Sequence, residues 1–154
     1  MSKLCLATSE EEYSAARKLF AEYAASLEID LKFQRFEEEL QVLESMYALP
    51  DGGIILAKED EQFIGCVAIR KIDNTTGELK RMYLKPAYQN RGLGKRLLVN
   101  ALELAKTCKY KTVRLDTLSG MLPAIALYKS AGFKEIAPYY FNPNPEAVYF
   151  EKNL

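Results

Sequence analysis

Apolar and polar positions in the first third of the chain repeat with the period of an α-helix. An apolar run at residues 3–7 has the length of a short strand, and Ser9 with Glu12 three residues later fits a capping box at a helix start. A second helix is predicted by apolar residues at helical spacing between Phe36 and Tyr47, before a turn at residues 50–53. The apolar stripe of the first helix consists of Tyr13, Ala16, Phe20, Tyr23 and Leu27.

The period changes to that of strands from Ile54 onward. Two apolar runs at residues 54–58 and 63–69 flank four polar residues, which predicts a hairpin. A polar turn at residues 73–77 then leads into a further strand at residues 78–84. The middle of the chain is therefore expected to form an antiparallel meander.

The last third of the chain alternates helices and strands. A helix is predicted at residues 92–107 and a half-buried strand at residues 112–116, so the strand at 78–84, this helix and this strand form a right-handed crossover with parallel pairing. Pro123 opens a short helix that ends at Gly132, and strands follow at residues 133–136 and 147–151. We expect an α+β fold with a mixed, mostly antiparallel sheet, in one domain spanning residues 1–154.

Composition narrows the possible chemistry. The chain has 154 residues, and no histidine, which excludes Cys-His and Ser-His catalysis and most zinc sites, so we expect no metal. Three scattered cysteines are expected to be reduced. No apolar run approaches the roughly 18 residues of a membrane span, and residues 1–5 lack a signal-peptide core. We therefore expect a cytoplasmic protein without a membrane partner.

Charge is distributed unevenly although the net charge is zero. Residues 1–61 carry 14 acidic and 6 basic groups, and the remainder carries 7 acidic and 15 basic groups. A basic half suits a polyphosphate ligand and an acidic half suits a cationic amine, although both sets of charges could simply be solvated. Nucleic acid is a poor candidate partner because the net charge is zero and the first half is acidic. The basic residues that suggest nucleic-acid binding are Lys80, Arg81, Lys85, Arg91, Lys95 and Arg96.

A glycine-rich turn at residues 89–95 separates the strand at 78–84 from the following helix. The first N–H groups of a helix have no intrahelical partners, and Gly92 and Gly94 would let a phosphate approach them closely. A Walker loop needs a different spacing, and a dinucleotide fingerprint needs a glycine where Leu97 stands. The alternative is a tight turn with solvated basic residues.

Three blocks, at residues 78–86, 89–105 and 124–133, resemble motifs of the GNAT N-acetyltransferase superfamily in their order and spacing. One departure is Met121, which stands where many members have an asparagine. The resemblance implies a twisted sheet with helices on both faces and acetyl-CoA as cosubstrate. It implies that Gln89 supports the loop, that main-chain N–H groups hold the pyrophosphate and pantetheine, and that Tyr128 protonates the departing thiolate. The implied cofactor-binding residues are Met82, Tyr83, Leu84, Gln89, Asn90, Arg91, Gly92, Leu93, Gly94 and Lys95.

Aminolysis of a thioester requires a neutral amine, yet an alkyl amine with a pKa of about 10.4 is mostly protonated at neutral pH. Glu78 is the candidate base because it begins the strand that leads to the loop; the alternative is an exposed glutamate at a strand end. Asp116 is the second candidate, or a hydrogen-bonding residue of the sheet, and water is the third. Tyr128 is a suitable proton donor with a reference pKa near 10, or else a packed core tyrosine.

The sequence thus predicts an acetyl-CoA dependent N-acetyltransferase that acts on a primary amine by direct transfer in a ternary complex. Cys66 and Cys108 lack a neighbouring base, so an acyl-enzyme is not expected. The alternative is a non-catalytic acyl-CoA sensing module, against which the presence of both Glu78 and Tyr128 argues. The acceptor is a small-molecule or peptide amine, and a homodimer is possible. The candidate acceptor-binding residues are Tyr23, Phe33, Asp116, Tyr139, Tyr140 and Asn142.

Overall fold

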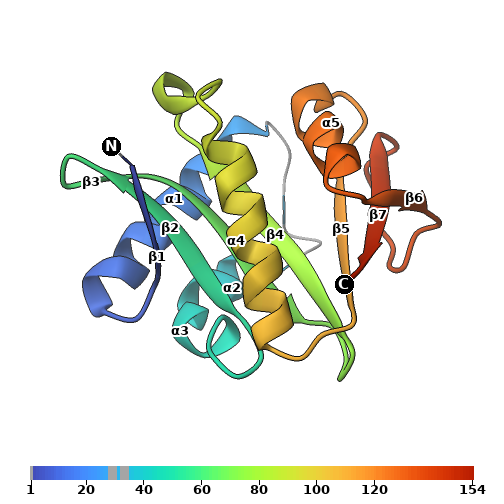
Figure 1. Cartoon of the computed structure of the whole chain (residues 1–154), viewed down its shortest axis with the longest axis horizontal. Coiled ribbons are helices and arrows are strands. Elements are labelled where there is room, and N and C mark those ends of the chain that lie inside the picture. The colour runs from blue at the N-terminus through green and yellow to red at the C-terminus, as the bar shows by residue number, and fades with distance from the viewer. Residues whose placement is uncertain (1, 28–30, 32–34) are drawn as a thin grey trace.

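The computed structural model describes residues 2–27, 31 and 35–154. Its sheet has the order β1-β2-β3-β4-β5-β7-β6, and β4 with β5 is its parallel pair (Figure 1). The strands are β1 (Lys3–Leu6), β2 (Gly53–Glu59), β3 (Gln62–Lys71), β4 (Thr76–Leu84), β5 (Thr112–Leu118), β6 (Lys134–Ile136) and β7 (Ala147–Asn153). The helices are α1 (Glu10–Ser26), α2 (Phe36–Gln41), α3 (Leu43–Met46), α4 (Leu93–Thr107) and α5 (Leu122–Ser130), with a 3-10 turn at Pro86–Tyr88. The expected α+β fold with a mixed sheet is confirmed.

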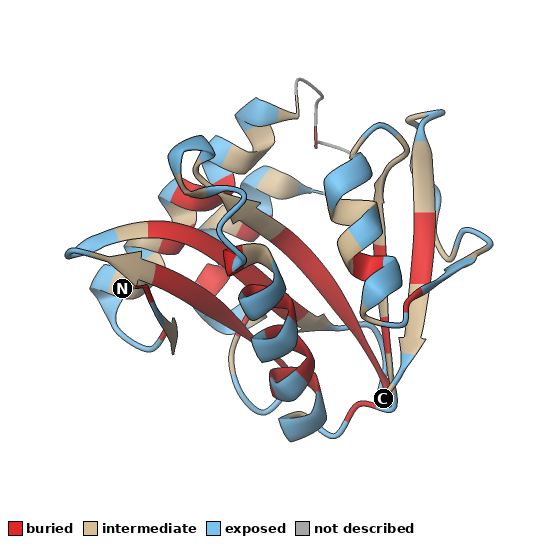
Figure 2. Cartoon of the chain, turned by 45° about the horizontal axis from the view of Figure 1, so that its top comes forward, coloured by how far each residue is buried: buried red, intermediate tan, exposed pale blue. Residues whose placement is uncertain are grey.

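Helices cover both faces of the sheet. The amphipathic helix α4 packs on β2, β3 and β4, while α1 packs on the opposite face of the same strands. Each face has its own buried cluster, one containing Leu97 and Leu98 of α4 and the other containing Phe20 of α1 with Tyr47. Figure 2 shows the buried residues concentrated in the central strands and on the inner side of α4. No helix in the described residues is long and apolar enough to cross a bilayer.

The capping box at the start of α1 forms as predicted. The Ser9 hydroxyl accepts a hydrogen bond from the Glu12 main-chain N–H at 3.1 Å, and the Glu12 carboxylate accepts from the Ser9 N–H at 3.0 Å. The predicted second helix is instead divided in two, because the backbone of Val42 leaves the helical region at φ −117° and ψ 26°. The division keeps Leu43 and Tyr47 fully buried on the core side.

A β-bulge interrupts β4 beside β3. Cys66 pairs with Tyr83 and Ala68 pairs with Lys80, so two residues of β4, Arg81 and Met82, lie opposite Val67. Arg81 has a φ of 58°, in the left-handed region. The buried thiol of Cys66 donates a hydrogen bond to the Arg81 carbonyl at 3.2 Å, and its pKa is raised by burial. The protonated thiol therefore donates a hydrogen bond to a carbonyl that the bulge removes from the regular pairing of β3 with β4.

The parallel strands β4 and β5 pair over only three residue pairs, from Thr76 with Thr112 to Glu78 with Arg114. Beyond Glu78 the paired residues of β4 bond to β3, while β5 continues alongside β7. The two strands diverge visibly in Figure 1. Strand pairing between β4 and β5 consequently ends at Glu78 and Arg114.

Candidate functional site

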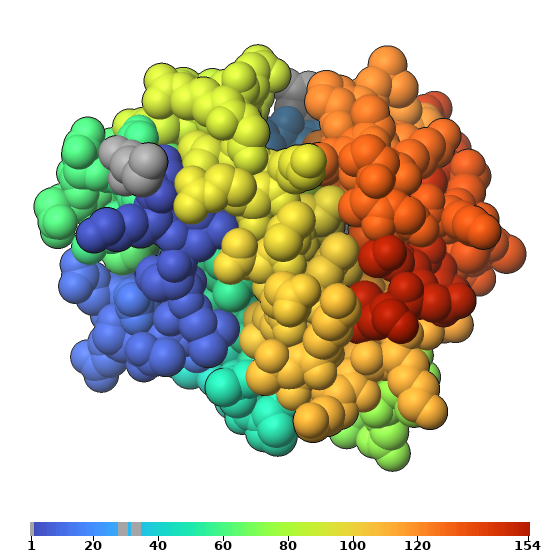
Figure 3. Space-filling view, viewed as in Figure 1, coloured from blue at the N-terminus to red at the C-terminus, as the bar shows by residue number. Residues whose placement is uncertain are grey.

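A cleft occupies the space where β4 and β5 diverge. Figure 3 shows a hollow on this side of the molecule, between the start of α4 and α5. Its walls come from α1, β4, the end of β5, α5 and the segment before β7. The residues that line it include Tyr23, Leu79, Lys80, Arg81, Met82, Asp116, Thr117, Met121, Ala124, Tyr128 and Asn142.

The glycine turn ends at the N-terminus of α4, next to this cleft. Gly92 is the N-cap with φ 78°, a conformation that favours glycine, and Asn90 is also left-handed at φ 64°. A Cβ atom at Gly94 would make ordinary contacts with Leu127 at 3.5 Å and Leu84 at 3.9 Å. The fold therefore needs glycine at position 92 for its backbone angle, whereas it could accommodate a small side chain at position 94.

Side chains around the turn tie it to neighbouring strands. The Gln89 amide donates a hydrogen bond to the carbonyl of Leu84 at 3.0 Å, which joins the turn to the end of β4. Arg91 lies over the ring of Tyr88 at 5.3 Å and within 3.6 Å of the Glu59 carboxylate. Lys95 is exposed on the first turn of α4. The predicted loop residues thus gather at one helix start.

Tyr128 of α5 lies in the wall of the cleft. Its ring packs edge-on against Phe133, with centroids 5.8 Å apart, and also contacts Phe150. Burial raises the pKa of its hydroxyl, and nearby Tyr23 and Asp116 raise it further. Tyr128 is therefore a core tyrosine that also borders the cleft, and its role as proton donor stays a prediction. Its hydroxyl stays protonated over the physiological pH range.

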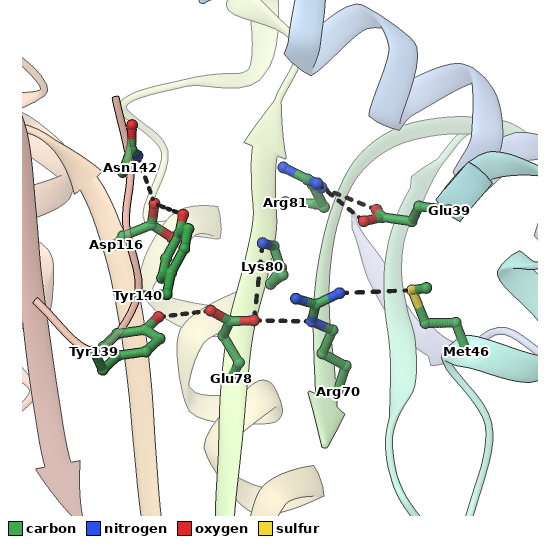
Figure 4. A network of polar contacts seen from close by, with 10 residues as sticks. All are labelled: Glu39, Met46, Arg70, Glu78, Lys80, Arg81, Asp116, Tyr139, Tyr140 and Asn142. Atoms are coloured by element: carbon green, nitrogen blue, oxygen red, sulfur yellow. Dashed lines mark hydrogen bonds and ion pairs between the residues drawn. The ribbon is translucent and has the colours of Figure 1, made fainter. Parts of the chain in front are cut away.

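Glu78 is buried, so the alternative of an exposed strand-end glutamate is wrong. Its carboxylate accepts hydrogen bonds from Arg70 at 2.8 Å and from the Tyr139 hydroxyl at 2.6 Å, and Lys80 Nζ lies 3.8 Å away (Figure 4). Burial opposes ionisation, but Lys80, Arg70 and Tyr139 together outweigh it and lower the pKa of Glu78. Among the described residues that line the cleft, Glu78 is absent; it lines a second pocket instead.

Asp116 of β5 is the carboxylate that shares the cleft with Tyr128. It accepts hydrogen bonds from the Tyr140 hydroxyl and from the Asn142 amide, the latter at 3.1 Å. The Tyr140 carbonyl in turn accepts from Tyr149 at 3.1 Å. The segment before β7 is thus fastened to β5 through Asp116.

The candidate acceptor residues divide between the two cavities. Tyr23 and Asn142 line the cleft, and burial raises the pKa of Tyr23 to about 12. Tyr139 and Tyr140 line the second pocket. Phe33 lies outside the residues that the structure describes. The structure therefore brings Tyr23, Asp116, Tyr128 and Asn142 together around the cleft, and Glu78 lies behind Lys80 in the neighbouring pocket.

Two of the basic residues that suggested nucleic-acid binding, Lys80 and Arg81, are buried and therefore cannot contact phosphates at the surface. Arg81 makes two hydrogen bonds of 3.0 Å to Glu39 (Figure 4). Its guanidinium also lies 5.0 Å from the Phe36 ring. Strand alternation could have indicated that Lys80 lies beside Glu78, because the two residues are two positions apart and so face the same side of β4.

Comparison with known proteins agrees with the fold. The family model described as the acetyltransferase (GNAT) family matches residues 15–133. The chain belongs to this family. An uncharacterized N-acetyltransferase of Schizosaccharomyces pombe is 36% identical over 140 residues, which make up 90% of this chain and 86% of that protein. Together, this GNAT membership and this relative identify the chain as an N-acetyltransferase.

Solved GNAT structures share the whole fold. An acetyltransferase of Streptococcus agalactiae superposes with a TM-score of 0.81 at 24% identity, covering 99% of this chain and 98% of that one. The PaiA N-acetyltransferase of Thermoplasma acidophilum, solved with coenzyme A, has a TM-score of 0.73 at 20% identity and covers 100% and 99%. Within the described part of this GNAT chain, no group of three or more acidic or cysteine side chains is arranged to hold a metal ion.

Proposed function

We propose that this N-acetyltransferase binds acetyl-CoA in the cleft and transfers the acetyl group directly to a primary amine in a ternary complex. The observation that carries the proposal is the cleft itself, which lies where β4 and β5 separate and adjoins the start of α4 and Tyr128. The coenzyme A in the PaiA structure, which has the same fold, supports the choice of cofactor.

The main chain would hold most of the cofactor. N–H groups at residues 91–95 would bind the pyrophosphate at the positive end of the α4 dipole, where Gly92 and Gly94 leave the backbone accessible. The pantetheine arm would lie along residues 82–84, because the pairing of β4 with β5 ends at Glu78 and leaves this side of β4 without a neighbouring strand. A main-chain N–H beside the bulge would polarise the thioester carbonyl as charge develops on its oxygen.

The chemistry needs one proton acceptor and one donor. The amine nitrogen bonds to the acetyl carbon, the carbon–sulfur bond breaks, and the sulfur takes a proton from the Tyr128 hydroxyl, which solvent then restores. The amine proton goes to a carboxylate. Glu78 is the candidate expected from the sequence, but its pKa is held low. Asp116 borders the cleft itself.

The two carboxylates are distinguished by substitution. Loss of the base should lower kcat at neutral pH. The decrease in kcat should be smaller at higher pH, where more of the amine is already neutral. We expect this pH dependence for either Asp116→Asn or Glu78→Gln. A pH-independent loss in one variant would assign that residue a structural role, and a pH-independent loss in both would leave water as the proton acceptor.

Calorimetric titration with acetyl-CoA tests the proposal. Gly94→Asp places a carboxylate where the pyrophosphate would lie, at a position whose protein contacts are ordinary, and is expected to abolish binding. Val99→Asp adds the same charge further along α4, on an exposed position, and is expected to bind as the wild type does. Folded wild-type protein that fails to bind acetyl-CoA would refute the proposal.

A further inference from the structure

A second pocket lies on the α2 side of the sheet, beyond the proposed thioester position. It is bordered by α2, α3, the end of β3, the beginning of β4 and the tyrosines before β7. Lys80 lines both this pocket and the cleft, so the two cavities meet at its side chain. Figure 4 shows Tyr139, Glu78 and Arg70 in a row, with Lys80 above Glu78. The pocket therefore approaches the cleft from the face of the sheet opposite α4, with the buried Lys80 side chain between the two cavities.

The mouth of this pocket combines apolar side chains with the exposed polar residues Arg35, Glu38, Gln41 and Lys71. Val42 is 46% exposed and Ile72 is 37% exposed, although both are large hydrophobic residues. Met46 and the rings of Tyr139 and Tyr140 extend the apolar surface inward. Exposed apolar side chains that gather at one opening indicate a binding surface for an apolar group.

The carboxylates on the floor of the pocket are already engaged. Glu39 holds the guanidinium of Arg81 through two hydrogen bonds, and Glu78 holds that of Arg70. A second cation entering the pocket would have to displace a buried guanidinium or approach Arg70 and Lys80 directly. The floor therefore disfavours an acceptor with several positive charges.

We propose that the second pocket admits the acceptor, and that the acceptor is a primary amine carried on an apolar or aromatic body rather than a polyamine. The inference rests on the proposed function. The apolar body lies against Val42, Ile72 and the two tyrosine rings, and the amine passes Lys80 to meet the thioester in the cleft.

Release of free coenzyme A thiol from acetyl-CoA, followed with phenethylamine and with spermidine, tests the inference. We expect kcat/KM to be at least about tenfold higher for phenethylamine, because removal of apolar contacts in a binding pocket changes discrimination by about that factor. Val42→Asp is expected to lower kcat/KM for phenethylamine about tenfold and to leave the Kd of acetyl-CoA unchanged. Val99→Asp, at an equally exposed valine on α4, is the matched control and should change neither.

Three results would overturn the inference. They are equal or better use of spermidine, identical behaviour of Val42→Asp and Val99→Asp, and acetyl-CoA binding without acetylation of either amine. In each of these cases the wild type still binds acetyl-CoA, so the proposed cofactor site would stand. Failure of the wild type to bind acetyl-CoA would instead refute the proposed function. Ile72→Asp, in the turn after β3, replaces Val42→Asp if that variant does not fold.

Discussion

Replacing Glu39 by glutamine should remove a large part of the stability of this protein. The side chains of Glu39 and Arg81 are 1% and 2% exposed, and two charge-assisted hydrogen bonds join them. Breaking a buried ion pair by neutralising one partner typically costs about 3–5 kcal/mol, because the other charge stays buried. Glutamine keeps one acceptor oxygen, so we expect about 3 kcal/mol, against a total stability on the order of 5–15 kcal/mol.

Equilibrium unfolding in urea measures this loss. With a slope of about 2 kcal/mol per molar, a loss of 3 kcal/mol moves the midpoint by about 1.5 M. Glu44→Gln is the control, since its partner Arg17 and Glu44 itself have side chains 35% and 48% exposed. A surface pair of this kind contributes no more than about 1 kcal/mol. The reasoning is refuted if Glu39→Gln costs as little as the control.

Three further variants test the site and the fold. Tyr128→Phe should lower kcat about 100-fold with little change in the Kd of acetyl-CoA; equal turnover would remove Tyr128 from the mechanism. Glu12→Ala should cost about 1 kcal/mol at pH 7. Two main-chain N–H groups lower the pKa of Glu12 to about 2, so the difference from wild type should shrink as pH falls from about 4.5 towards 2, and a constant difference would contradict this origin. Cys66→Val should cost about 1–3 kcal/mol in urea unfolding, because the Arg81 carbonyl loses its donor, and Cys66→Ser less. Equal stability of the valine variant would show that the thiol is dispensable.

The elements of the fold were predictable because the helices bury one face and the central strands β2 and β3 bury both. Helical spacing marked α1 and α4, and strand-length apolar runs marked β2 and β3, all within a few residues of their observed ends. The capping box at Ser9 is a local interaction, so it could be recognised from two residues alone. The predicted start of α4 at Gly92 differs from the observed one by a single residue.

The polar interior of the site could not be predicted because its partners are distant in the chain. Glu39 and Arg81 are 42 residues apart, and Tyr139 and Glu78 are 61 apart. Their contacts exist only once β4 lies between β3 and β5 and α2 covers its face. The division at Val42 and the bulge at Arg81 likewise depend on packing between elements.

Three residue pairs join β4 to β5, so the sheet consists of two blocks, β1–β4 and β5–β7, that are connected by a short stretch of main-chain pairing. A pantetheine arm lying along β4 would act as a strand that the polypeptide itself does not supply. The cofactor would then brace the two blocks, and ligand binding would appear as a rise in melting temperature that grows with acetyl-CoA concentration. Amide hydrogens of β4 beyond Glu78 would exchange more slowly in the same experiment.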